Sequence, residues 1–186
     1  MIGKGVRGRM DVVKGPDRIQ TEREEKDRIF ERLVETYQTA LLRTCFLYLK
    51  DQELARDAVQ ETFLKAYRSW DSFRGESSEK TWLVRIAVNQ CRDEQKSAWF
   101  RHVSRRVTLD QLPPASIPFA PEDETLLQDV MRLPPKLREA TLLYYYQGMN
   151  VNEIAQALGI RHSSVSERLR RARERLRDNL EGRDAP

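Results

Sequence analysis

Apolar residues recur at three- and four-residue steps along most of the chain, a spacing that places them on one face of an α-helix. No segment shows the alternation of apolar and polar positions that is typical of a β-strand. The first stripe consists of Ile29, Leu33, Tyr37, Leu41 and Thr44. The pattern therefore predicts an all-α protein whose first long helix begins at about Glu25.

Two further helices are predicted before residue 100. Asp51 is a suitable N-cap for the first of them. Its predicted inner face holds Leu54, Ala58, Phe63, Ala66 and Trp70. Residues 73–78 contain a glycine and two serines, which predicts a loop. A third helix is expected from about Lys80 to Phe100.

The regular spacing is lost in two places. Residues 1–24 are polar and aperiodic, so a flexible N-terminal extension is expected. Residues 101–121 also lack periodicity and hold four of the eight prolines, at positions 113, 114, 118 and 121. We interpret this segment as a linker. The prediction is two small helical domains, over residues 25–100 and 122–181, followed by a short tail over residues 182–186.

Helix signals return after residue 121. The apolar side of a short helix is formed by Leu126, Leu127, Val130 and Leu133. Pro134 and Pro135 end this helix and begin the next, because proline is tolerated in a first turn. Asn150 and Glu153 match a capping box, and Gly159 is a suitable terminator for the helix that they begin. Ser163 is predicted to cap a final helix with a buried side of Val165, Leu169, Ala172 and Leu176.

Composition and charge restrict the classes of function and partner that we expect. The chain of 186 residues has a net charge of +4 and a pI of about 9.2, a slight preference for a polyanionic partner. The two cysteines, Cys45 and Cys91, lie in helical segments and are expected to be buried thiols in a reducing compartment. His102 and His162 lack metal-ligand spacing, so no metal is expected. Because apolar runs are short, we expect a cytoplasmic protein without membrane insertion.

No enzyme motif is evident. The chain has no glycine-rich phosphate loop and no nucleophile elbow, so we expect no catalytic residues and no cofactor.

The last two predicted helices carry the clearest functional pattern. A short helix, a glycine-containing turn and a second helix form the helix-turn-helix arrangement, which places its second helix in the DNA major groove. Between Arg161 and Arg177 there are seven arginines and two glutamates. A solvated, arginine-rich helix is the simpler alternative for the final helix taken alone.

The sequence NVNEIAQALGI at residues 150–160, followed by RLRRAR at 168–173, resembles the promoter-binding C-terminal domain of sigma factors. The resemblance implies that this domain binds the −35 element. The residues that would face bases and nearby phosphates are Ser164, Ser166, Glu167, Arg170 and Arg171. Arg168 would hold a phosphate.

The second predicted helix presents a stripe of Asp57, Gln60, Glu61 and Leu64. Such a stripe is often only a solvated helix face. The segment DAVQETF at residues 57–63 nevertheless resembles the sigma-factor segment that binds the clamp helices of the polymerase β′ subunit. The resemblance implies that this stripe binds core RNA polymerase.

The third predicted helix carries a basic and amide stripe of Arg85, Asn89, Arg92 and Lys96, beside Trp82. Burial of Trp82 in the core is the simpler alternative for that residue. Residues 81–89, TWLVRIAVN, resemble the sigma-factor stretch that melts the −10 element. The resemblance implies capture of an unpaired base by Phe73, Arg74, Ser77, Ser78, Lys80 and Asn89.

The three motifs follow in the order found in sigma-70 family factors, and the short linker is similar to that of the extracytoplasmic-function (ECF) class. The implied function is promoter recognition and opening for transcription initiation. The implied partners are core RNA polymerase (β′ and β), promoter DNA and an anti-sigma factor. Two alternatives stay open from the residues themselves: a stand-alone helix-turn-helix regulator that binds operator DNA, and a helical interaction module.

Overall fold

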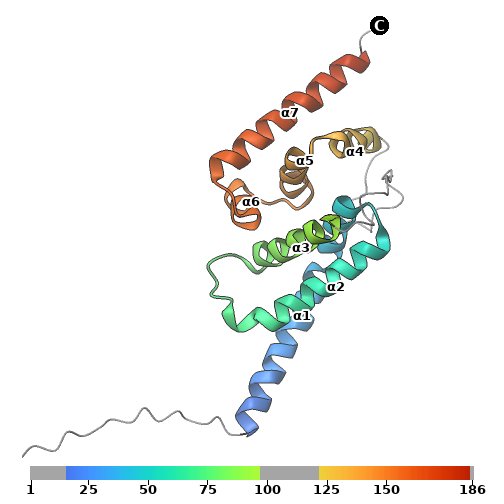
Figure 1. Ribbon diagram of the computed structural model, residues 1–186. Helices are drawn as coiled ribbons and strands as arrows, with labels where there is room; N and C mark the ends of the chain where they lie inside the picture. Colours follow the sequence, from blue (N-terminus) through green and yellow to red (C-terminus); the bar gives the residue numbers. More distant parts are fainter. Residues whose placement is uncertain (1–15, 97–121, 185–186) are drawn as a thin grey trace, which may run out of the picture. The chain divides into compact units, whose positions relative to one another are not determined.

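The computed structural model describes residues 16–96 and 122–184, and within these ranges the regular elements are all helices (Figure 1). This confirms the predicted all-α class. The elements before the gap are α1 (Pro16–Leu49), α2 (Gln52–Ser69), the 3₁₀-helix η1 (Trp70–Ser72) and α3 (Glu79–Lys96). Those after it are α4 (Glu122–Arg132), α5 (Pro135–Thr141), the π-helix η4 (Leu142–Tyr146), α6 (Val151–Leu158) and α7 (His162–Asp184).

The first helix begins earlier than the apolar pattern indicates, at Pro16 instead of about Glu25. Proline suits a first helical turn, where its missing N–H is not needed. The rest of the predicted extension, residues 1–15, and the predicted linker at 101–121 lie outside the described residues. The chain divides into two units, residues 1–35 and 36–186, so the boundary falls within α1.

The helices α2 and α3 pack through small side chains. The buried residues of α2 are Ala55, Ala58, Val59, Thr62 and Ala66. The predicted inner positions Leu54, Phe63 and Trp70 are half-buried instead. Small residues let two helix backbones approach closely, so α3 can bury Leu83, Val84 and Ala87 against this face.

The predicted burial of the two cysteines is confirmed. Cys45 and Cys91 are buried, free thiols. A hydrogen bond with Cys45, together with burial, raises the pKa of the Cys91 thiol well above its ordinary value.

Local capping signals of the sequence are largely confirmed. The Asp51 carboxylate accepts a hydrogen bond from Leu54 N–H at 3.0 Å and caps α2. At α6, Glu153 N–H donates to Asn150 Oδ1 at 3.0 Å and Asn150 N–H donates to Glu153 Oε2 at 2.8 Å, a complete capping box. Gly159 ends α6 with a φ of 65°, in the left-handed region that favours glycine.

Two predictions for the C-terminal helices are wrong. Ser163 does not cap α7, because the helix already begins at His162 and Ser164 N–H donates to Arg161 C=O at 3.0 Å. Leu126 is 41% exposed, although its neighbour Leu127 is fully buried. The predicted stripe of α7 is confirmed. Val165, Leu169 and Ala172 are buried. Leu176 packs against a buried cluster of Leu133, Leu137 and Ala172.

Candidate nucleic-acid and polymerase-binding surfaces

The stripe predicted on α2 is a surface feature. Asp57 and Gln60 are exposed and Glu61 is half-buried. Leu64 is 49% exposed, one of the few large apolar side chains of the described residues that face solvent. The stripe therefore combines acidic and amide groups with an apolar contact, which suits binding to a basic protein surface. We call these four residues the α2 patch.

Three aromatic rings gather where α2 ends and α3 begins. The ring centroids of Phe73 and Trp82 lie 4.8 Å apart, and those of Trp70 and Phe73 lie 5.3 Å apart. Trp70 and Trp82 meet edge to face at 5.9 Å. Trp82 and Phe73 are only half-buried, so part of this aromatic cluster is open to solvent. Trp70, which the sequence placed in the core, belongs to this cluster.

The loop before α3 orders the start of that helix. Ser78 Oγ accepts a hydrogen bond from Thr81 N–H at 3.1 Å and lies 2.9 Å from the Thr81 hydroxyl. Ser78 therefore acts as a helix cap as well as a predicted DNA contact. Arg74 is exposed and Ser77 is half-buried. Gly75 adopts a φ of 71°, which lets the loop turn without strain.

The basic stripe predicted on α3 divides into two parts. Arg85 and Asn89 are exposed, and so is Lys96, which pairs with Asp93 at 2.7 Å. Arg92 is half-buried and donates to Glu139 from Nε at 3.0 Å and from Nη2 at 2.7 Å. Lys80 donates to the backbone C=O of Gln147. The outer part of the stripe thus faces solvent, whereas Lys80 and Arg92 contact the C-terminal half of the chain.

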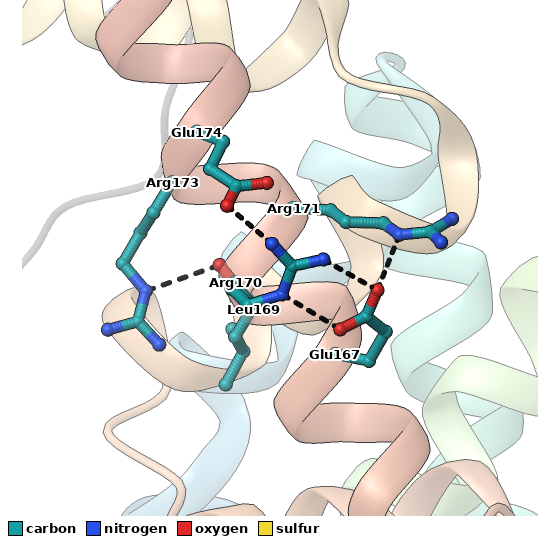
Figure 2. Close-up of polar contacts among 6 residues, drawn as sticks. All are labelled: Glu167, Leu169, Arg170, Arg171, Arg173 and Glu174. Atoms are coloured by element: carbon teal, nitrogen blue, oxygen red, sulfur yellow. Dashed lines mark hydrogen bonds and ion pairs between the residues drawn. The ribbon is translucent and has the colours of Figure 1, made fainter.

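The predicted base-reading side of α7 contains a local charge network (Figure 2). Glu167 accepts from Arg170 at 2.9 Å and from Arg171 at 2.6 Å, and Arg170 also pairs with Glu174. The hydrogen bonds from Arg170 and Arg171 lower the pKa of Glu167 to about 2. The same contact with Glu167 raises the pKa of Arg170. Glu167 therefore orients two exposed arginines on one helix face.

The other predicted α7 contacts are less exposed. Ser164 and Ser166 are half-buried. The Arg168 side chain is 19% exposed, and its Nη1 lies 3.4 Å from Glu139 Oε2. Glu139 and Gln147 were not singled out in the sequence, yet both hold predicted DNA-binding cations. Nothing in local spacing identifies them, because their partners are distant along the chain.

Among residues 16–96 and 122–184, no group of His, Cys, Asp and Glu side chains could hold a metal ion. No described helix is long and apolar enough to cross a membrane.

Comparison with known families matches both halves of the chain. Residues 33–101 match the family model of sigma-70 region 2, and residues 124–176 match that of sigma-70 region 4. The first match covers the α2 patch, the aromatic cluster and α3, and the second covers the helix-turn-helix. The fold and these surfaces thus define a two-region transcription factor of the sigma-70 type.

Individual relatives agree with this assignment. The RNA polymerase sigma-E factor of Streptomyces avermitilis is 34% identical over 160 residues, which cover 83% of this chain and 87% of that protein. The ECF RNA polymerase sigma-E factor of Haemophilus influenzae is 30% identical, over 83% of this chain and 88% of the relative. The chain belongs to the sigma-70 family of RNA polymerase sigma factors, in its ECF class.

Solved structures show the same fold. CnrH in complex with the cytosolic domain of CnrY is 27% identical with a TM-score of 0.65, covering 84% of this chain and 90% of that one. The sigma factor RpoE of Bartonella quintana, solved with the anti-sigma factor NepR, has a TM-score of 0.67 at 24% identity. It covers 83% of this chain and 98% of that chain.

Proposed function

We propose that the α2 patch binds core RNA polymerase at the β′ clamp helices, with further contact to the β subunit. The support is the exposure of Asp57 and Gln60 beside the solvent-facing Leu64. Complementary charge sets the orientation and the rate of an encounter, and a buried apolar contact adds affinity. This docking holds the chain's DNA-binding surfaces on the polymerase.

The proposed −10 surface surrounds the aromatic cluster. A base extruded from the duplex needs an aromatic or apolar contact, a polar edge that reads it and cations along the backbone. Phe73 and Trp82 offer the first, Asn89 the second and the exposed Arg85 a cation. The complete proposed set is Phe73, Arg74, Ser77, Ser78, Lys80, Trp82, Arg85, Asn89, Arg92 and Lys96.

The proposed −35 surface is the N-terminal part of α7. Exposed arginines there suit both phosphates and guanine edges, because the guanidinium can donate two parallel hydrogen bonds. The proposed contacts are Ser164, Ser166, Glu167, Arg168, Arg170 and Arg171. Glu167 would align Arg170 and Arg171 and could itself accept from a cytosine amino group.

The proposed domain organisation keeps residues 25–100 as the polymerase and −10 domain, residues 101–121 as the linker and residues 122–181 as the −35 domain. The chain would act in the cytoplasm as a non-catalytic subunit, since phosphodiester chemistry belongs to the polymerase. CnrH was solved bound to a second polypeptide, and on that analogy an anti-sigma factor is among the proposed partners.

The observation that carries the proposal is the presence, in one chain, of the exposed α2 patch, a partly exposed aromatic cluster and a helix α7 with exposed arginines. A stand-alone operator-binding regulator would need only the helix-turn-helix, and a helical interaction module would need neither DNA surface. The α2 patch and the two proposed DNA surfaces are useful together only when a larger enzyme positions all three of them.

Run-off transcription with purified core polymerase, with and without this chain, tests the proposal together with a DNA shift by the chain alone. Promoter-specific transcripts are expected only in the combined reaction, with weak and salt-sensitive binding by the free chain. Tight, sequence-specific binding by the free chain, without stimulation of transcription, would establish the stand-alone regulator instead.

A further inference from the structure

A cavity with a strongly basic lining is formed by side chains of α1, α3, α5, η4 and α7, all from the unit of residues 36–186. Its volume is about 340 Å³, which is within the usual range for sites that bind small molecules. The charged residues of the lining are Glu139, Arg92, Lys136, Arg138 and Arg168. Four of these groups are cations and one is a carboxylate, so the cavity has a large excess of positive charge.

The single carboxylate of the lining is already shared by two arginines. Arg92 donates to Glu139 Oε1 from Nε at 3.0 Å and from Nη2 at 2.7 Å. Arg168 Nη1 lies 3.4 Å from Glu139 Oε2. The Glu139 side chain is only 10% exposed, so these contacts fix both guanidinium groups at the wall of the cavity. Glu139 therefore positions cations there, but one negative charge does not balance them.

Arg138 is a cation of the lining whose charge has no counter-ion nearby. It is half-buried, and its Nη1 donates to a neutral acceptor, Met131 C=O, at 2.9 Å. Among residues 16–96 and 122–184, no carboxylate forms an ion pair with Arg138. Burial lowers the pKa of Arg138, and burial followed by the charge of Arg138 lowers the pKa of Lys50. A buried charge is costly unless it is paired, so this cluster of cations suits an anionic ligand.

Tyr48 adds a neutral hydrogen-bond donor to the same lining. The residue is only 6% exposed, and its hydroxyl has no hydrogen-bond partner among the described residues. Burial raises the pKa of this hydroxyl, and the charge of Glu139 raises it further, although the two groups do not reach hydrogen-bond geometry. An unsatisfied buried donor costs free energy, which a ligand oxygen would recover. A water molecule would satisfy the hydroxyl but would leave the excess positive charge uncompensated.

We propose that this cavity binds the phosphoryl group of a small anion, either inorganic phosphate or a nucleoside diphosphate. Phosphoryl oxygens are strong acceptors, and arginine forks bind them with two parallel hydrogen bonds. The apolar residues Pro135 and Leu142 also line the cavity and would face the uncharged part of a larger ligand. A duplex is a less suitable occupant, because Tyr48 and Glu139 lie below the protein surface. The inference concerns the free chain and does not rest on the proposed function.

Isothermal titration calorimetry with the full-length chain tests the site, with inorganic phosphate and ADP as separate ligands at constant ionic strength in chloride. One saturable site is expected for at least one ligand, with a Kd below about 1 mM. Tighter binding of ADP would identify a phosphate ester as the preferred ligand, and tighter binding of phosphate would identify the free ion. Adenosine, which lacks a phosphoryl group, should not bind.

Three variants remove one donor each. Arg138→Met keeps an apolar side chain of similar length and should weaken binding at least about tenfold, the effect of losing a charge-assisted hydrogen bond. Tyr48→Phe removes only the hydroxyl and should weaken binding about three- to tenfold. Because that hydroxyl has no partner, Tyr48→Phe should not lower the melting temperature of the ligand-free chain. Lys136→Met lies at an exposed position, so it should weaken binding without disturbing the core.

The matched control is Arg68→Met, which removes one positive charge at an exposed position of α2 outside the cavity. It should bind as tightly as the unchanged chain. Equal affinities of Arg68→Met, Arg138→Met and Lys136→Met would show only a general attraction of anions to a basic chain and would overturn the site. The absence of saturable binding of either ligand to the unchanged chain would overturn it too. Since neither polymerase nor DNA is used, such a failure leaves the proposed function untouched.

Discussion

At the residue scale, Glu167 shows how one acidic group can belong to a DNA-binding helix. Its contacts with Arg170 and Arg171 are exposed, so each adds little to stability. Their effect is positional, since both guanidinium groups are held on one side of α7 (Figure 2). An isolated arginine would sample many rotamers and lose that freedom on binding DNA.

The lowered pKa of Glu167 can be tested directly. A carboxyl-carbon NMR titration should give a midpoint at about 2, against an ordinary value of 4.5. Because the folded-state pKa is depressed, the contribution of this carboxylate to stability is present above 4.5 and is lost as pH falls through about 2. Arg171→Ala should move the midpoint towards 4.5, whereas Arg175→Ala, further along α7, should not. An unshifted midpoint in the unchanged chain would contradict the ion pairs.

In the proposed function, strand capture depends most on Asn89. Asn89→Ala should slow opening of duplex promoters about five- to tenfold, the effect of losing one or two hydrogen bonds to an extruded base. The loss should be smaller on pre-melted templates, where separating the strands no longer requires binding energy. Gln90→Ala is a suitable control, since Gln90 instead contacts Lys65 and Glu94. Equal losses on both templates would remove the capture role.

At the element scale, helix ends were predictable where the signal is local. Asp51, Asn150 and Gly159 each act within three or four residues of their own position, so sequence spacing identifies them. Leu126 was misplaced because several registers of a short amphipathic helix are compatible with its pattern. Glu139 and Gln147 could not be found at all. Their partners lie 29 to 107 residues away, and only the tertiary fold brings them together.

The capping box of α6 gives a quantitative prediction. Asn150→Ala removes the acceptor of Glu153 N–H and should lower the free energy of unfolding by about 1 kcal/mol, measured by urea denaturation. Asn152→Ala lies inside the same short helix, where alanine is favoured, and should be neutral or slightly stabilising. The recognition helix follows directly after α6, so Asn150→Ala should also weaken −35 binding. Equal stability of the two variants would show that the box contributes nothing.

Charge reversal tests whether the α2 patch binds core polymerase. Asp57→Arg with Glu61→Arg should weaken binding to core polymerase by at least about a hundredfold, because like charges would face each other across the interface. The control, Glu31→Arg with Glu35→Arg, makes the same change in net charge at the same spacing on exposed positions of α1. Circular dichroism should show unchanged helicity in both variants. Equal binding of the two variants, measured by surface plasmon resonance, would remove the docking assignment.

At the scale of the whole molecule, the proposed function places the two DNA surfaces of one chain on two separate promoter elements. Three of the proposed DNA-binding cations have protein partners in the structure: Glu139 contacts Arg92 and Arg168, and the backbone C=O of Gln147 accepts from Lys80. Elements centred at −35 and −10 lie about 85 Å apart, at 3.4 Å per base pair of B-form DNA, so the proposed surfaces would lie far apart when both are bound. The predicted linker, residues 101–121, would therefore set how far apart the two DNA surfaces can reach.

Because the two DNA surfaces must reach separate promoter elements, shortening the linker should reduce transcription more than lengthening it. A linker of twenty-one residues can extend to about 71 Å at most, and removing twelve leaves about 31 Å. That deletion should abolish transcription that depends on the −35 element while sparing initiation on a pre-melted −10 template. Inserting twelve Gly/Ser residues should reduce −35-dependent transcription only about twofold, since effective concentration falls as the −3/2 power of linker length. Run-off assays on both templates make the comparison. If deletion and insertion had equal effects, the segment would not act as a tether, and a fixed spacing between the two surfaces would have to come from another part of the chain.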